Sequence, residues 1–188
     1  SAALGGDEIA FVNGRSVHAD GIKSFGFGDH LVRLRFVSTE GGHGHQAEVA
    51  VDIEPNSRTI ILETYEGLAE DYVSNVSLRF EVADDSHLIR IVLAQDAAIA
   101  LAVSTAEVEL GRGATFHQTV LSTGAKLQRL ETRVAHPGEG ATVRLDGLYL
   151  LSGARHADLT SVVDHLGPNG QTSQLTKGVV RDTARGVF

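Results

Sequence analysis

Hydrophobic and polar residues alternate along much of the chain. From Asn75 to Val82 every even position is apolar and every odd position is polar, and a similar alternation runs from Gln46 to Glu54. Shorter versions cover residues 32–36 and 106–110. Because successive side chains of a strand point to opposite faces, this period predicts β-strands with one buried face and one face in solvent.

Evidence for helices is weak. The apolar, alanine-rich stretch from Ala97 to Val103 has no polar face, and we interpret it as a buried strand, with a helical turn as the alternative. Gly67 to Ser74 could form one helical turn. No segment shows the amphipathic pattern of about ten to fifteen residues that alternates with strands in doubly wound proteins. The chain is therefore expected to be all-β.

Glycine–alanine pairs recur in the second half, each at the start of a new strand-like run. Their glycines stand at positions 113, 124, 140 and 153, so the steps are 11, 16 and 13 residues. Glycine suits a corner that needs unusual φ, and alanine suits a crowded inward position. Such corners favour a coil of short strands, although a β-sandwich joined by hairpins fits the strands almost as well. Loops are predicted at 40–46, 136–140 and 167–171, and residues 1–188 are expected to form one domain.

Composition and charge exclude several classes of function. The chain has no cysteine, which excludes disulfides and thiolate metal ligands from its own residues. A net charge of −8 and only 5% aromatic residues argue against a nucleic-acid surface or an anionic membrane. No window reaches the roughly 18 apolar residues of a membrane span, and the start is no secretory signal, so we expect a cytoplasmic protein. Methionine is absent even from position 1, which favours a piece of a longer protein.

Histidines supply the candidate chemistry. His43 and His45 could share a metal if both lie on one strand. With Glu48 they resemble the first cupin motif, although Glu48 follows after only two intervening residues, fewer than in that motif. A solvated glycine-rich loop is the alternative. His156 and Asp158 would share a strand face, where a hydrogen bond between them could fix the tautomer of the histidine. The motifs of P-loop ATPases, dinucleotide-binding folds and nucleophile elbows are incomplete or missing.

A series of motifs in the C-terminal third resembles the SufB/SufD family of the SUF iron–sulfur cluster assembly system. A Gly-x-Tyr-Leu strand ends at Leu150 and is followed by His-x-Asp, Asp-His, Thr-Ser-x-x-x-Lys and Arg-x-Val-Phe. Ile9 to Gly14 is similar to the opening strand of the family's core, and the SufD branch is the closer match. The motif residues are taken as structural or interface positions: Tyr149, His156, Asp158, His165, Thr172, Ser173, Lys177, Arg185 and Phe188.

This resemblance implies a right-handed parallel β-helix and a scaffold without catalytic activity. It implies pairing with a SufB-like subunit and cooperation with a SufC-like ATPase, which would bind through regions outside this chain. An iron–sulfur cluster would be carried only transiently, in the assembled complex, and this chain would hold no cofactor of its own. The alternative from the residues is a metal- or carbohydrate-dependent enzyme on a β-helix or jelly roll.

The chain also departs from the family. Many relatives have Pro-His-Cys-Thr-Ser where this chain has Pro168 to Ser173, so any role of that histidine and cysteine is not carried over. The family's N-terminal helical region and its C-terminal segments are not recognised here. An open coil at Phe188 would expose strand edges, so we expect self-association, for example as a homodimer.

Overall fold

The structure is a computed structural model that describes residues 7–17, 23–25 and 28–188. Within these ranges all regular secondary structure is β-strand. The first four strands are β1 (Asp7–Val12), β2 (Arg15–Ser16), β3 (Lys23–Phe25) and β4 (Asp29–Ser38). The next are β5 (Gly44–Ile53), β6 (Arg58–Gly67), β7 (Val73–Val82), β8 (His87–Gln95), β9 (Leu101–Leu110) and β10 (Thr115–Ser122). The last are β11 (Leu127–His136), β12 (Thr142–Leu151), β13 (His156–His165), β14 (Gln171–Val180) and β15 (Arg185–Val187).

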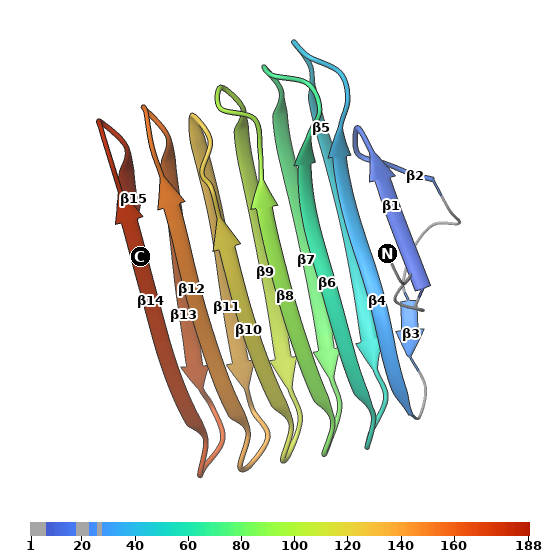
Figure 1. Cartoon of the computed structure of the whole chain (residues 1–188). Coiled ribbons are helices and arrows are strands. Elements are labelled where there is room, and N and C mark those ends of the chain that lie inside the picture. Colours follow the sequence, from blue (N-terminus) through green and yellow to red (C-terminus); the bar gives the residue numbers. More distant parts are fainter. Residues whose placement is uncertain (1–6, 18–22, 26–27) are drawn as a thin grey trace.

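The strands form two sheets that lie face to face (Figure 1). Sheet A has the order β14-β12-β10-β8-β6-β4-β1-β2, and sheet B has the order β15-β13-β11-β9-β7-β5-β3. From β4 onward the chain passes from one sheet to the other at every corner, and neighbours within each sheet run parallel, as between β4 and β6 or β5 and β7. The chain therefore winds as a parallel β-helix. The predicted all-β coil is confirmed, and the hairpin-linked sandwich is wrong.

Each turn of the coil has nearly the same length. In sheet A, one ladder of partners starts at Asp29 and continues through Arg58, His87, Thr115, Thr142 and Gln171. These positions are 27 to 29 residues apart, as the differences between successive numbers show. The uneven steps between glycine–alanine pairs arise because the pairs mark consecutive corners, which lie alternately on the two sides of the coil. Gly113 and Gly140 lie at corners that follow odd-numbered strands, on one side of the coil, and Gly124 and Gly153 lie at corners that follow even-numbered strands, on the other side.

The corners explain the glycine–alanine pairs. The glycines at 113, 124, 140 and 153 all have φ between 64° and 73°, a conformation that residues with a Cβ rarely adopt. The following alanines at 114, 125 and 141 are fully buried, as expected for inward positions. Ala154 differs because it is exposed at its corner. The glycine–alanine pairs therefore identified four corners correctly, and three of their four alanines are buried as expected.

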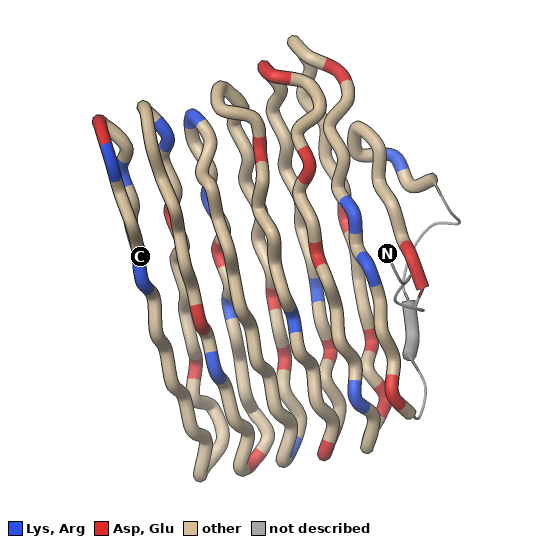
Figure 2. Tube along the Cα trace, in the orientation of Figure 1, with Lys and Arg blue, Asp and Glu red and all other residues tan. Residues whose placement is uncertain are grey.

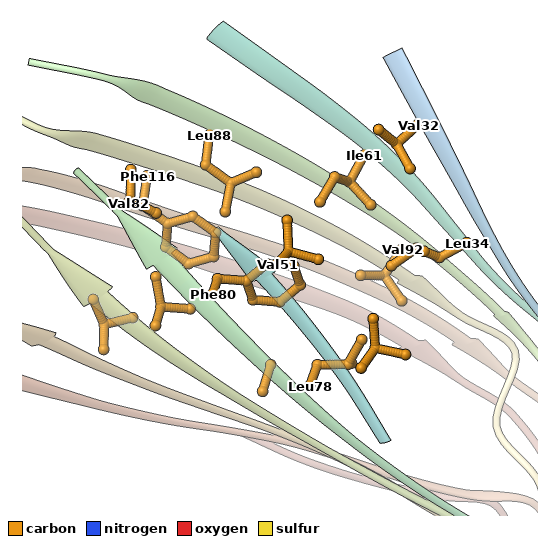
Figure 3. Packing of buried hydrophobic residues seen from close by; sticks show 14 of the residues in the cluster. Val32, Leu34, Val51, Ile61, Leu78, Phe80, Val82, Leu88, Val92 and Phe116 are labelled. Carbon is orange, nitrogen blue, oxygen red and sulfur yellow. The ribbon is translucent and has the colours of Figure 1, made fainter. Parts of the chain in front are cut away.

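A continuous hydrophobic core fills the space between the sheets. The inward residues of facing strands interdigitate, and Figure 3 shows Phe80, Leu88 and Phe116 among them. Aromatic side chains also stack along the coil, with ring centroids 5.2 Å apart for Phe11 and Phe36 and 5.1 Å for Phe36 and Tyr65. Stacking of equivalent positions in successive turns buries the apolar side chains that one turn alone would leave exposed.

Several predicted boundaries need correction. The opening strand ends at Val12, because Asn13 and Gly14 form the two-residue turn of the β1–β2 hairpin with φ of 48° and 76°. Strand β9 begins at Leu101, so most of the predicted strand from Ala97 lies in a corner. Residues 67–74 contain no helical turn. The predicted loops at 40–46, 136–140 and 167–171 lie at corners, although their edges belong to strands.

Charges of both signs are interleaved along the whole coil (Figure 2). The negative net charge is therefore spread over many positions and does not form one acidic face. Across the described ranges, no helix is long and apolar enough to cross a membrane.

Candidate functional site

A buried ion pair lies inside the coil. The guanidinium of Arg90 in β8 donates two hydrogen bonds to the carboxylate of Glu63 in β6, from Nε and Nη2, each 2.7 Å long. The side chains are 2% and 0% exposed. Burial acts to lower the pKa of Arg90, and the attraction of Glu63 more than offsets it, so that the pKa is raised. The guanidinium therefore remains charged inside the core, where it depends on the carboxylate that accepts its hydrogen bonds.

Neighbouring polar groups complete this network across the two sheets. Arg90 Nη1 donates to Gln118 Oε1 at 2.6 Å, and Gln118 Nε2 donates to Thr132 Oγ1 at 3.0 Å. The guanidinium also lies over the ring of Phe80, 5.6 Å from its centroid. Burial and the nearby carboxylate of Glu63 raise the pKa of Tyr65. The network links sheet A to sheet B through buried and satisfied groups, which is typical of a structural rather than a reacting site.

A second polar cluster lies at the corners that follow the even-numbered strands. Asp96 accepts hydrogen bonds from Tyr72 Oη at 2.8 Å and from Gln128 Nε2 at 2.6 Å. Arg155 Nη1 donates to the backbone carbonyls of Gly124 at 2.6 Å and Asp96 at 3.3 Å. Burial raises the pKa of Asp96, although the bonds from Tyr72 and Gln128 oppose the shift. The cluster ties successive corners together.

His43 and His45, the candidate metal ligands, point to different environments. His43 is exposed in the corner before β5, whereas His45 is half-buried within β5 and its Nε2 lies 2.8 Å from Ser38 Oγ. Burial lowers the pKa of His45. Both residues border a hollow of about 570 Å³ together with Glu40. In the described part of the chain, no group of three or more histidine, aspartate or glutamate side chains could hold a metal ion.

Two histidines lie together on the opposite side of the coil, at the corners that follow the odd-numbered strands. His136 ends β11 and is completely buried, and neither of its ring nitrogens has a hydrogen-bond partner. Its ring meets the ring of His165 edge to face, with centroids 4.2 Å apart. Nε2 of His165 lies 3.1 Å from Thr172 Oγ1. The motif residues His165 and Thr172 are thus brought together, and the burial of His136 beside them was not predicted.

Tyr149 forms the centre of a small apolar cluster near the last turn. It is buried in β12 with Leu151 and Ala157, and the ring of Phe188 lies 6.4 Å from its own. Gly178 of β14 and Gly186 of β15 lie so close to this ring that a Cβ on either would overlap it. Two of the motif positions, Tyr149 and Phe188, therefore contact each other as part of the fold.

We expect the substitution Gly178→Ala to destabilise the protein. The added methyl group would displace the ring of Tyr149, and overpacking of this kind costs about 1 to 3 kcal/mol. Urea unfolding measures the change. Ser173→Ala, on the exposed face of the same strand, is the control and should change the unfolding free energy by less than about 0.5 kcal/mol. Equal stability of the two variants would show that the ring has space to move.

The remaining motif residues do not form one cluster. His156 and Asp158 are both in the extended strand β13, but Asp158 accepts a hydrogen bond from Thr160 Oγ1 at 2.6 Å and pairs with Arg129 at 3.4 Å. The motif residues of β14 and β15 with exposed side chains are Ser173, Lys177 and Arg185. Arg185 is the register partner of His156 in sheet B, whereas Ser173 and Lys177 lie in sheet A, and the family role of all four residues stays a prediction.

Sequence reasoning missed the buried polar network, although a signal was present. Glu63 and Arg90 each occupy a position where the alternating pattern requires an inward apolar residue, and they are 27 residues apart. Aligning the chain with itself at the length of one turn places these two charges in neighbouring turns. Oppositely charged residues at inward positions of adjacent turns predict a buried pair.

The fold defines the class as a parallel β-helix with a hydrophobic core and internal polar ties. Residues 36–188 match the family model described as "SUF system FeS cluster assembly, SufBD core domain". The chain is also 25% identical over 139 residues to iron–sulfur cluster assembly SufBD family proteins of Mycobacterium bovis and Mycobacterium tuberculosis. The match covers 74% of this chain and 34% of each relative, so the chain spans about a third of the relatives' length. The chain belongs to the SufBD family, a family of iron–sulfur cluster assembly components.

Proposed function

We propose that this chain is a non-catalytic scaffold of the SUF iron–sulfur assembly system, of the SufD type. The observation that carries the proposal is the match of residues 36–188, nearly the whole coil, to the SufBD core. In this role the chain would pair with a SufB-like subunit and act with a SufC-like ATPase in the cytoplasm. The iron–sulfur cluster is the cargo of the assembled complex.

The internal chemistry of the coil supports a scaffold. Arg90, Glu63 and Gln118 satisfy one another inside the core, and Asp96 is held by Tyr72 and Gln128. Groups that are buried and fully hydrogen-bonded stabilise one arrangement and have no access to a substrate. The chain also contains no thiolate to hold a cluster, so in this proposal the cysteine ligands come from the partner. The choice of the SufD type depends on the sequence motifs around Tyr149 and His165.

Co-purification tests this function. The full-length gene product is co-expressed with the SufB-like and SufC-like proteins of the same organism, with the affinity tag on the SufB-like subunit. We expect all three proteins to elute together from size-exclusion chromatography. A tagged unrelated β-helix protein is the control for non-specific capture. Failure to associate, with each partner shown to be folded, would contradict the proposed function.

A further inference from the structure

The outer face of sheet B has an aliphatic row along one edge. Where β7, β9 and β11 begin, the register aligns Val73 with Leu101 and Leu101 with Leu127, and Val103 follows Leu101 on the same face. Val73 is 49% exposed and Leu127 is 41% exposed, whereas Leu101 and Val103 are half-buried. We call these four residues the aliphatic edge. Exposed aliphatic side chains that adjoin one another are typical of a contact surface.

A hollow lies next to the aliphatic edge, over the middle of β5, β7 and β9. Its volume is about 570 Å³, and its lining includes the small side chains of Ala50, Ser77 and Thr105. Glu48 of β5 and Glu107 of β9 border it on the two strands that flank β7. The small side chains leave room between the two carboxylates for a long side chain of another molecule.

The charges beside this hollow do not balance once the ion pairs are counted. Both signs are interleaved on this face as on the rest of the coil (Figure 2), but its outward arginines already have carboxylate partners, in the pairs Arg79–Glu81, Arg129–Glu131 and Arg133–Glu131. In the described part of the chain, Glu48, Glu107 and Glu109 have no hydrogen-bond or ion-pair partner. The charges left over after pairing are therefore negative.

We propose that this face binds an amphipathic, basic helix of a partner protein. The apolar side of the helix would pack on the aliphatic edge, and lysine or arginine side chains on its flank would enter the hollow between Glu48 and Glu107. Carboxylates alone attract any cation, and an apolar edge alone accepts any apolar surface. Side by side, the two features match the two flanks of one amphipathic helix.

The dimensions of the face suit such a helix, lying across the strands along the axis of the coil (Figure 1). The long strands β5, β7, β9, β11 and β13 lie ~4.8 Å apart, so together they span about 19 Å. A helix of about 13 residues has this length, and its turns recur every ~5.4 Å, close to the spacing of Val73, Leu101 and Leu127. The contact is smaller than the about 800 Å² per partner of a standard interface, so it is weak and transient.

Fluorescence anisotropy tests the apolar contact with a defined probe. The probe is a fluorescein-labelled synthetic helix of about 14 residues, with leucines along one side and lysines along one flank, titrated with the purified chain. We expect saturable binding that weakens by about 10-fold in Val103→Asp. Ile91→Asp is the matched control, because Ile91 is a half-buried, outward aliphatic residue of sheet A, and it should leave binding unchanged. Val73→Asp, at a more exposed position, tests the same contact if Val103→Asp fails to fold.

The carboxylates are tested separately with the same probe. Glu48→Gln combined with Glu107→Gln should weaken binding by about 5-fold and make it less sensitive to salt, because the two unpaired charges beside the hollow are lost. Asp7→Asn combined with Asp29→Asn is the control. Both aspartates are exposed on sheet A, so this variant changes the net charge equally without touching the proposed contact.

Three results would overturn the inference. One is the absence of saturable binding to the wild type. Another is equal binding of a peptide with the same composition in scrambled order, which would show a general attraction of cations to an acidic protein. The last is an equal loss of binding in Ile91→Asp, which would place the contact elsewhere. The inference goes beyond the proposed function, because the probe can bind whether or not a SufB-like subunit associates with the chain.

Discussion

The substitution Arg90→Met is expected to destabilise the protein by about 3 to 5 kcal/mol, because it leaves the carboxylate of Glu63 buried without its partner. Glu63 is fully buried, and both of its oxygens accept hydrogen bonds from Arg90. Gln118 also loses the donor to its Oε1, although Thr132 continues to donate to the same atom. Chemical denaturation monitored by circular dichroism measures the change in unfolding free energy.

The double variant Glu63→Leu with Arg90→Met measures what the ion pair as a whole contributes to stability. Replacing both charges by apolar residues removes the uncompensated carboxylate, so its stability should return close to that of the wild type. Arg79→Met is the control for losing an arginine in general. Arg79 pairs with Glu81 at the surface, where both side chains are more than half exposed, and its loss should cost less than about 1 kcal/mol. A single variant Arg90→Met as stable as this control would refute the argument.

The substitution His136→Leu is expected to raise stability, by about 1 to 3 kcal/mol at neutral pH. His136 is fully buried and neither ring nitrogen has a partner, so its polar groups lose their hydration without compensation. In the three preceding turns the same inward position is held by Ile53, Val82 and Leu110. Leucine therefore restores the pattern of the stack.

The gain should be larger at acidic pH. Burial, and then the neighbouring His165, lower the pKa of His136 in the folded protein. In the unfolded chain the imidazole takes up a proton as the pH falls through about 6.5, whereas in the folded chain it does so only at lower pH. The unfolded state then binds more protons below about pH 6.5, so acidification destabilises the wild type through this residue.

Unfolding free energies measured at neutral and mildly acidic pH check this prediction. The pKa of His45 is also lowered in the folded protein, and the pKa of Asp96 is raised. Because these groups also titrate, wild type and variant are compared at each pH. His43→Leu, at an exposed corner position, is the control. A variant His136→Leu that is less stable than the wild type, or that keeps the full pH dependence, would show that the imidazole is stabilised in the folded state.

The inward and outward alternation was predictable because it is a local property of an extended chain. The strand from Asn75 to Val82 has the predicted alternation of buried and exposed residues. The stretch from Ala97 was harder because alanine-rich apolar segments fit both a strand and a packed corner. There, contacts with Tyr72 of the preceding turn and Ala125 of the following turn decide the conformation.

The candidate site was less predictable because its partners are one turn apart. His136 and His165 are register partners 29 residues apart, and Glu63 and Arg90 are diagonal neighbours on adjacent strands, 27 residues apart. Both pairs meet only when the coil stacks successive turns. The motif residues were found by resemblance, which identified their order but not their contacts. His165 meets Thr172 as neighbouring motif positions, whereas Ser173 and Lys177 face solvent.

Local backbone preferences, composition and motif order were enough to predict the strands, the corners at the glycine–alanine pairs, the absence of thiolate chemistry and the resemblance to the SufB/SufD family. The stacking of the strands as a coil and not a sandwich became visible only in the folded chain, as did the contacts of Arg90 with Glu63 and of His136 with His165. Register between turns is set by packing across the whole core, and no short window of sequence contains it.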